Sequence, residues 1–313
     1  MKVKHLLALV VVAMVFSGIF VYYFAQSQKE QLATSSFIHR EKNKIVTQGP
    51  PKDPFKKPLG VSVSNDGGKI YVADSDNHRV RIFDKDWNLI TQFGKVGTEK
   101  GQFGYPVAAV ANNAGEIFVS EVFNNRVQVV SEQGHFIRWF PQNQKQLINP
   151  SILIIDPSDN VYVFDRGDQV IKVFSRNGEL ITKFGTGEGA NDKLRFVMGM
   201  DFAADGSLLV SDSGHRLIKQ FNVDGSFREL LTGVQGIPSM GLPRGLAVID
   251  KNKFAVVDSL SRKVYLLEKK GKIWKNRTLE HTFGLPDGIY YQQGKLYVTD
   301  RSDDSIVVFE NLS

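Results

Sequence analysis

The chain has 313 residues, of which 42% are hydrophobic and 23% are charged. These proportions are ordinary for a globular protein, so they exclude wholesale disorder, a collagen and a polytopic membrane protein. The chain has no cysteine, which excludes disulfide bonds, thiolate metal sites, cysteine nucleophiles and a lipidated cysteine anchor.

The formal net charge of +6 is unevenly distributed along the chain. Residues 1–57 hold nine Lys and Arg against three acids, whereas residues 58–313 hold 30 residues of each sign. The larger part of the chain is therefore neutral. A protein that binds phosphate backbones needs a basic surface to displace counterions, so a nucleic-acid partner is not expected.

The first residues of the chain form a membrane-targeting pattern, in which Lys2 and Lys4 precede an uncharged stretch at residues 6–25. About 20 helical residues span the hydrocarbon core, whereas the apolar region of a cleaved signal peptide has only about 7–15 residues. We therefore predict a cytoplasmic N-terminus at residues 1–5 and an uncleaved single-pass signal anchor at residues 6–25, with a cleaved signal peptide as the alternative. The rest of the chain then lies on the extracytoplasmic side of the cell membrane, joined to the anchor by a polar tether at residues 26–43.

Six segments of the remaining chain repeat one pattern. Each has an opening that resembles Pro-x-Gly, an alternating strand, a Gly-containing turn, a second strand that ends in an acid, a polar turn and a third strand. The strand-ending acids recur every 42–47 residues, a period that is typical of propeller blades. These acids are Asp74, Glu121, Asp165, Asp212, Asp258 and Asp300.

The sixth repeat has no fourth strand after its third strand at residues 305–309. Residues 44–49, which precede the first repeat, resemble the fourth strands of other repeats, such as residues 89–94. We therefore predict an all-β, six-bladed propeller over residues 44–313, with four-stranded antiparallel blades and an N-terminal strand that completes the last blade. This pairing would close the ring and cover an open sheet edge.

Three copies of the repeat carry a family resemblance. Residues 71–80 read Tyr-Val-Ala-Asp-Ser-Asp-Asn-His-Arg-Val, and similar residues recur at 118–121, 125–127 and 212–217. On these residues the chain resembles the NHL-repeat family of six-bladed β-propellers. The resemblance implies a scaffold that binds partners through the loops of its faces or through its central channel. Family members include enzymes, RNA-binding proteins and extracellular sensor domains on a membrane helix, so the fold alone does not choose a function.

The strand-ending acids are expected to be structural rather than catalytic, because each lies on a different blade. A carboxylate at this position can accept hydrogen bonds from backbone N–H groups of the turns and can pair with a basic side chain of the next turn. The arginines that we expect to form such pairs are Arg79, Arg126 and Arg262.

The second residue of each innermost strand is expected to line the mouth of the channel. Only two of these residues are charged, Arg244 and Asp287, and they open adjacent blades. They either pair with each other or, in the sharper hypothesis, Arg244 binds an anionic group of a ligand. Arg244 and Asp287 are therefore the candidate ligand-binding residues. The complete set is Leu59, Val107, Ser151, Met198, Arg244 and Asp287.

No catalytic or cofactor-binding motif is present in the sequence. The patterns GxSxG and HExxH and a Gly-rich phosphate loop before a helix are all missing. The six histidines do not occupy positions from which three could meet at one zinc ion. No catalytic residue, cofactor or metal site is therefore predicted, and a divalent cation such as calcium at Asp287 is the alternative.

These observations predict a membrane-anchored, extracytoplasmic propeller that acts as a binding, scaffold or sensor module. Its predicted partner is a protein, a peptide or a glycan of the cell envelope. The anchor, the neutral body and the missing catalytic motifs favour this function over an enzyme. Two alternatives stay open, which are a metal-dependent lactonase or lyase acting at the channel mouth and an RNA-binding propeller.

Overall fold

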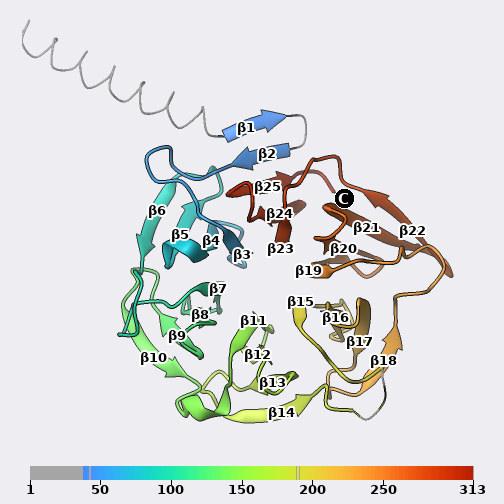
Figure 1. Cartoon of the computed structure of the whole chain (residues 1–313), viewed down its shortest axis with the longest axis horizontal. Helices are drawn as coiled ribbons and strands as arrows, with labels where there is room; N and C mark the ends of the chain where they lie inside the picture. Colours follow the sequence, from blue (N-terminus) through green and yellow to red (C-terminus); the bar gives the residue numbers. More distant parts are fainter. Residues whose placement is uncertain (1–37, 42–43, 188, 190, 313) are drawn as a thin grey trace, which may run out of the picture.

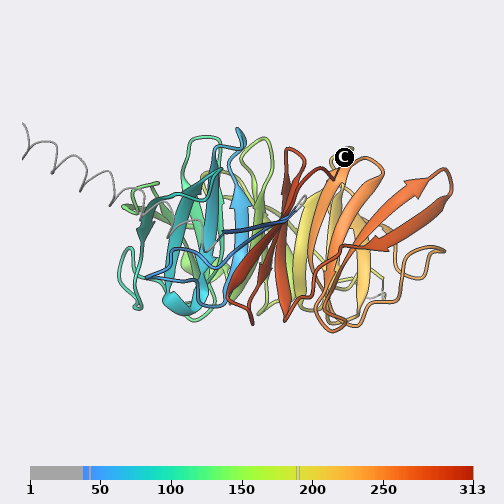
Figure 2. The ribbon, with the colours of Figure 1, turned by 90° about the horizontal axis from the view of Figure 1, so that it is seen from above.

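The computed structural model describes residues 38–41, 44–187, 189 and 191–312, which form 25 β-strands and two short 3₁₀ helices. Six β-sheets stand around a central channel like the blades of a propeller, with one edge of each sheet toward the axis (Figure 1). Seen from the side, the ring is a disc whose strands run from one face to the other (Figure 2). The all-β six-bladed propeller predicted from the repeats is confirmed.

The first three blades are four-stranded antiparallel sheets that follow one another in the chain. Blade 1 contains β3 (Pro58–Val63), β4 (Lys69–Asp74), β5 (Arg79–Asp84) and β6 (Leu89–Phe93), with the 3₁₀ helix η1 (Ser75–Asn77) between β4 and β5. Blade 2 contains β7 (Pro106–Ala111), β8 (Ile117–Glu121), β9 (Arg126–Val130) and β10 (Phe136–Phe140), and η2 (Gln144–Gln146) follows it. Blade 3 contains β11 (Pro150–Ile155), β12 (Val161–Asp165), β13 (Val170–Phe174) and β14 (Leu180–Phe184).

The last three blades include one sheet that uses both ends of the described chain. Blade 4 contains β15 (Val197–Phe202), β16 (Leu208–Asp212), β17 (Leu217–Phe221) and β18 (Phe227–Leu230). Blade 5 contains β19 (Pro243–Asp250), β20 (Lys253–Asp258), β21 (Lys263–Lys270) and β22 (Ile273–Thr278). Blade 6 contains β23 (Pro286–Gln292), β24 (Lys295–Asp300), β25 (Ser305–Phe309), β2 (Lys44–Thr47) and β1 (Ile38–Glu41).

The N-terminal strand β2 closes the ring, as predicted. It pairs antiparallel with β25, from Lys44 opposite Phe309 to Thr47 opposite Ile306. The tether predicted at residues 26–43 was wrong at its end, because Ile38–Glu41 form the strand β1. This strand pairs with β2 and extends blade 6 to five strands. The predicted anchor at residues 6–25 lies outside the described residues, and no helix within the described part has the length and apolarity to cross a bilayer.

The hydrophobic core lies between neighbouring blades rather than inside any one of them. The second strands β8, β12 and β16 are buried along their whole length, because adjacent blades cover both of their faces. Between blades 3 and 4, for example, Phe164 and Ile171 form one cluster with Met200 and Val210. Alternating apolar residues therefore hold the ring together by packing sheet against sheet.

A small residue near the start of an innermost strand lets two blades approach closely. A Cβ on Gly288 would lie 2.2 Å from the carbonyl oxygen of Leu59 in the next blade, and a Cβ on Gly199 would lie 2.3 Å from that of Arg244. Blade 3 has Ile152 at the corresponding position, and residues 151–155 of β11 all line the central channel. Blade 3 therefore has a bulky side chain at a position where the other five blades have Gly or Ala.

Candidate functional site

All six strand-ending acids are buried, and each holds the chain segment that leads into the innermost strand of its blade. The carboxylate of Asp74 accepts a hydrogen bond from the backbone N–H of Lys56 at 2.7 Å, and that of Glu121 accepts one from Gly104 at 2.8 Å. These bonds fix the loops on the face of the disc where the innermost strands begin, which we call the mouth face. The equivalent donors and acceptors are Ile148 and Asp165, Arg195 and Asp212, Leu242 and Asp258, and Leu285 and Asp300.

Two of the three predicted arginine partners pair with these acids, and the third does not. Nε of Arg79 donates to Asp74 at 2.8 Å, and Nε of Arg126 donates to Glu121 at 2.7 Å. The expectation for Arg262 was wrong, because its side chain is exposed and has no ion pair with any described residue. Arg262 comes four residues after its acid, at a left-handed turn position with φ of 56°, whereas the other two begin a strand five residues after theirs. This offset of one residue directs the side chain to solvent.

A second set of partners, which the sequence analysis missed, lies seven residues after the acid. Nε of the buried Arg81 lies 3.2 Å from Oδ2 of Asp74, and Nζ of the buried Lys219 lies 2.8 Å from Oδ2 of Asp212. The sequence feature that could have revealed them is a polar residue in the third strand of the blade, always seven residues after the acid, where the neighbouring buried residues are apolar. Blades 2 and 3 have Gln128 and Lys172 at this offset, and blades 5 and 6 have Tyr265 and Val307.

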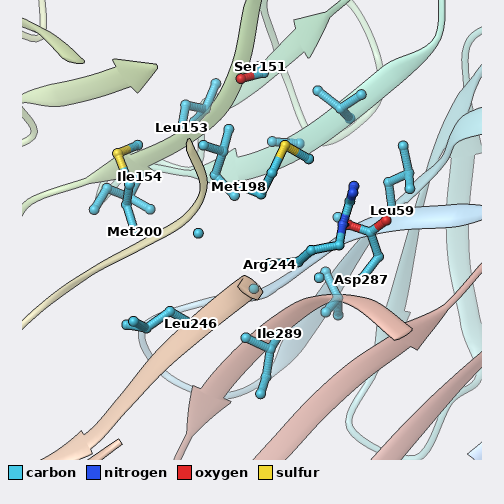
Figure 3. A pocket seen from close by; sticks show the side chains of 18 of the residues that line it. Leu59, Ser151, Leu153, Ile154, Met198, Met200, Arg244, Leu246, Asp287 and Ile289 are labelled. Carbon is cyan, nitrogen blue, oxygen red and sulfur yellow. The ribbon is translucent and has the colours of Figure 1, made fainter. Parts of the chain in front are cut away.

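The central channel contains a cavity of about 660 Å³ that extends to the mouth face. All six residues that were predicted to line the channel mouth line this cavity. Most of its other lining side chains are apolar, and Figure 3 shows Met200, Leu246 and Ile289 arranged around it. The channel is therefore an apolar pocket of the size that small-molecule sites have.

Charged side chains gather at the mouth end of the cavity. Nε of Arg244 donates to Oδ1 of Asp287 at 2.7 Å, and Nε of Arg301 lies 3.4 Å from Oδ2 of the same carboxylate. Burial raises the pKa of Asp287, although the charges of both arginines oppose this rise. The two candidate ligand-binding residues thus contact each other at the edge of the cavity (Figure 3).

Two arginines that line the cavity, Arg166 and Arg301, were not predicted from the sequence. Each follows the strand-ending acid of its blade directly, at a position that serine holds in blades 1, 4 and 5. One of these serines, Ser75, donates a hydrogen bond to the carbonyl oxygen of Pro106 in the next blade at 2.7 Å. This offset therefore faces the boundary between blades at the mouth, and comparing it across the repeats would have revealed both arginines.

A carboxylate and a phenol lie at the other end of the cavity. Asp201 accepts hydrogen bonds from the N–H groups of Val248 at 2.7 Å and Phe202 at 2.8 Å, and the hydroxyl of Tyr290 donates to the carbonyl oxygen of Val63 at 3.3 Å. Burial raises the pKa of Asp201 to about 6, and burial together with the charge of Asp201 raises the pKa of Tyr290 to about 12. These bonds join blade 4 to blade 5 and blade 6 to blade 1.

The raised pKa of Asp201 makes the stability of the protein depend on pH. The carboxyl has a pKa of about 6 in the folded protein and 3.8 in an unperturbed chain, so protonation stabilises the fold. This contribution is complete below about pH 4 and is lost as the pH rises through 6. Asp201→Asn mimics the protonated group and should not show the loss. Between pH 4 and pH 7, the free energy of unfolding of the unaltered protein should therefore fall by up to about 3 kcal/mol relative to the variant. Urea unfolding at several pH values measures this difference, and parallel pH profiles would contradict it.

The described part of the chain has no group of three His, Asp or Glu side chains placed to hold a metal ion. The carboxylate of Asp287, where calcium was the alternative, contacts Arg244 and Arg301 instead. No histidine of the described residues lines the cavity. The arrangement at the mouth therefore offers donors from guanidinium groups rather than a set of metal ligands.

Comparison with known proteins identifies the repeat. The model of the NHL repeat matches residues 55–83. The chain is 31% identical over 133 residues to the protein brain tumor of Drosophila melanogaster, a match that covers 42% of this chain and 12% of that protein. It is 27% identical over 123 residues to the human E3 ubiquitin-protein ligase NHLRC1, covering 39% of this chain and 30% of that protein. The matched region thus spans less than a third of either relative.

Solved structures share the fold at low sequence identity. A catalytically inactive virginiamycin B lyase from Staphylococcus aureus, solved with quinupristin, aligns with a TM-score of 0.60 and 15% identity. The alignment covers 87% of this chain and 93% of the lyase. These findings support the resemblance to the NHL-repeat propellers, and the chain is a six-bladed β-propeller that carries an NHL repeat at residues 55–83.

Proposed function

We propose that this propeller is a binding module that holds a protein or peptide partner on its mouth face. The observation that carries the proposal is a set of large apolar side chains exposed on the loops of this face. Phe123 and Leu260 are each 67% exposed, Ile148 is 52% exposed and Phe196 is 42% exposed. Exposed apolar side chains around a pocket are typical of surfaces that bind proteins.

Neighbouring side chains hold two of these aromatic rings in place. The ring of Phe123 stacks on Tyr105 with a centroid distance of 4.8 Å and an interplanar angle of 22°. The guanidinium groups of Arg166 and Arg195 each lie 5.9 Å from the centroid of Phe196. Aromatic and arginine side chains dominate the binding energy of protein interfaces, and rings that are already ordered lose little entropy on binding.

The nature of the partner follows from this chemistry. An apolar face with ordered aromatic rings suits a protein or peptide better than a glycan, whose hydroxyl groups need many polar partners. The human relative is named as a ligase that acts on proteins, which supports a protein partner. The neutral balance of residues 58–313 does not favour RNA. The similarity to the lyase concerns the fold alone, so it does not assign a catalytic role to any residue of this chain.

The proposal includes the location of the propeller. Residues 6–25 form the signal anchor and the residues between it and β1 form the tether, so that the propeller and its mouth face lie outside the cytoplasm. This assignment is supported by the uncharged stretch of a length that suits a bilayer and by the lysines in front of it. The partner is then a component of the cell envelope.

One labelling experiment tests both the location and the face. Because the chain has no cysteine, an Arg262→Cys variant carries a single thiol on the mouth face, beside Leu260, and leaves the aromatic rings of that face in place. A membrane-impermeant maleimide that bears a photo-crosslinking group is added to intact cells that produce the full chain. We expect labelling without lysis and, after irradiation, one defined cross-linked protein.

The matched control is Ile181→Cys, which places the thiol on the outer strand β14, at an exposed position away from the mouth. It should be labelled equally well but should not yield the defined product. Labelling only after lysis would show that the proposed location is wrong. The same product from both variants would show that the mouth face does not select the partner.

A further inference from the structure

We infer that the channel cavity binds a small amphipathic carboxylate, with its apolar body in the channel and its carboxylate on Arg244 and Arg301. The inference goes beyond the proposed protein partner, because it concerns the interior of the ring and not the loops of the mouth face. Its support comes from the shape of the cavity, the side chains that line it and the unequal charges at its two ends.

The interior of the cavity suits an apolar body. Val107, Met198, Met200, Leu246 and Ile289 come from four different blades and line it together. Flexible methionine side chains adapt to ligands of varied shape, and burying an apolar chain among such residues is favourable in proportion to the area removed from water. The volume of about 660 Å³ falls within the range of about 300–1,000 Å³ for small-molecule sites.

The mouth end of the cavity has more positive than negative charge. Arg166, Arg244 and Arg301 line it against one acid, Asp287. The terminal guanidinium nitrogens of these three arginines donate no hydrogen bond to the residues that the structure describes. Nε of Arg166 and Nε of Arg301 are also buried without a hydrogen-bond partner. The terminal nitrogens, unlike the two Nε atoms, are not buried, and they are therefore free to receive an anion.

Asp287 fixes the orientation of the Arg244 guanidinium group but accepts only one of its N–H donors. It takes one N–H of Arg244 at 2.7 Å and faces Nε of Arg301 at 3.4 Å. A guanidinium group has five N–H donors in one plane, and a carboxylate can accept two of them side by side. A second carboxylate, brought by the ligand, would satisfy the donors that remain.

The opposite end of the cavity sets the direction in which the ligand lies. Asp201 and Tyr290 each stand three residues further along the innermost strand than Met198 and Asp287, which is about 10 Å at the rise of a β-strand. The carboxylate of Asp201 already accepts two backbone N–H groups and would repel a second anion. The ligand therefore has one carboxylate, at the mouth, and an apolar end near Asp201.

Titration calorimetry on the full chain in lipid nanodiscs, with empty nanodiscs as the blank, tests this inference. Two probes represent the two sources of such a ligand, which are decanoate for a fatty acid and N-acetyl-Leu-Leu-Phe for a peptide C-terminus. Decanol and the amide of the peptide are the uncharged counterparts. We expect at least one carboxylate to bind about tenfold or more tightly than its uncharged counterpart, and the tighter of the two identifies the source.

Variants assign the effect to the arginines. Arg301→Gln removes a guanidinium with only a long contact to Asp287, and Arg244→Gln combined with Asp287→Asn removes the buried pair without leaving a lone charge. Each should weaken binding of the carboxylate about tenfold or more. Arg262→Gln, an exposed arginine outside the cavity, should leave the affinity unchanged.

Three results would overturn the inference. The first is the lack of binding by either carboxylate at about 1 mM. The second is equal binding of a carboxylate and its uncharged counterpart. The third is an unchanged affinity in both arginine variants. Because none of these measurements involves the mouth-face partner, failure here would leave the cross-linking result from Arg262→Cys untouched.

Discussion

The Ile45→Asp variant of the full chain is expected to unfold about 10 °C below the unaltered protein. Ile45 is 4% exposed and lies in β2, where it packs against Tyr297 and Val308 between blades 6 and 1. Losing a large buried apolar side chain costs about 2–5 kcal/mol, and a carboxylate among apolar neighbours adds to that cost. Since β2 is the strand that completes blade 6, its release would open the ring. A thermal melt of the full chain in nanodiscs, followed by tryptophan fluorescence, measures the change.

The same substitution at an exposed isoleucine provides the control for this prediction. Ile90 lies on the outer strand β6 and is half exposed. Ile90→Asp should shift the melting temperature by no more than about 2 °C, because surface substitutions have small effects. If the two variants had the same melting temperature, the pairing of β2 with β25 would not contribute more to the stability of the ring than an exposed outer strand does.

The Lys219→Met variant is expected to lose about 3–5 kcal/mol of unfolding free energy. Lys219 and Asp212 are both fully buried in blade 4, with Nζ of the lysine 2.8 Å from Oδ2 of the aspartate. Nζ also donates to the carbonyl oxygen of Lys193 at 2.6 Å. Removing the cation leaves a buried carboxylate whose other side-chain contact is Nδ1 of His215 at 2.8 Å, and the loss of the lysine charge from this desolvated pair is costly. Urea unfolding of the full chain measures the loss.

Removing both members of the pair separates this cost from a simple packing effect. Asp212→Asn combined with Lys219→Met should recover at least half of the loss, because no uncompensated charge then remains. Lys85→Met is the surface control, since Lys85 pairs with Asp86 at 2.9 Å where both side chains are exposed, and its urea unfolding curve should overlay that of the unaltered protein. A Lys219→Met protein as stable as the surface control would contradict the assigned role of the buried pair.

The architecture was predictable from the sequence because it depends on features that repeat. The strand-ending acids recur at a nearly constant spacing, and turns such as the one at Gly67 place glycine where φ is positive, at 74°. The closing strand was predictable because residues 44–47 match the fourth strands of other blades, and only the third strand of the sixth repeat lacked such a partner in the sequence. The strand β1 was not predictable, since its four residues, IHRE, form no alternating pattern.

The site was only partly predictable, because the direction of a side chain depends on local irregularities. The pairing register shifts near the start of the innermost strands, for example between Pro58 and Val61 and between Pro286 and Ile289. Such a shift changes which face the next residues occupy, and simple alternation cannot show it. Arg244 and Asp287 could be predicted because each is the second residue of an innermost strand. Arg301 lies in a turn beside the cavity, and its place there was not predicted.

The affinity of the cross-linked partner for the full chain, measured before and after the mouth face is made polar, tests the binding surface directly. Phe123→Ser combined with Phe196→Ser should weaken binding about tenfold or more, because these rings are the exposed aromatic anchors of that face. Leu180→Ser combined with Ile181→Ser on the outer strand β14 should leave the affinity within about twofold. Equal affinities for the two double variants would show that the mouth face is not the binding surface.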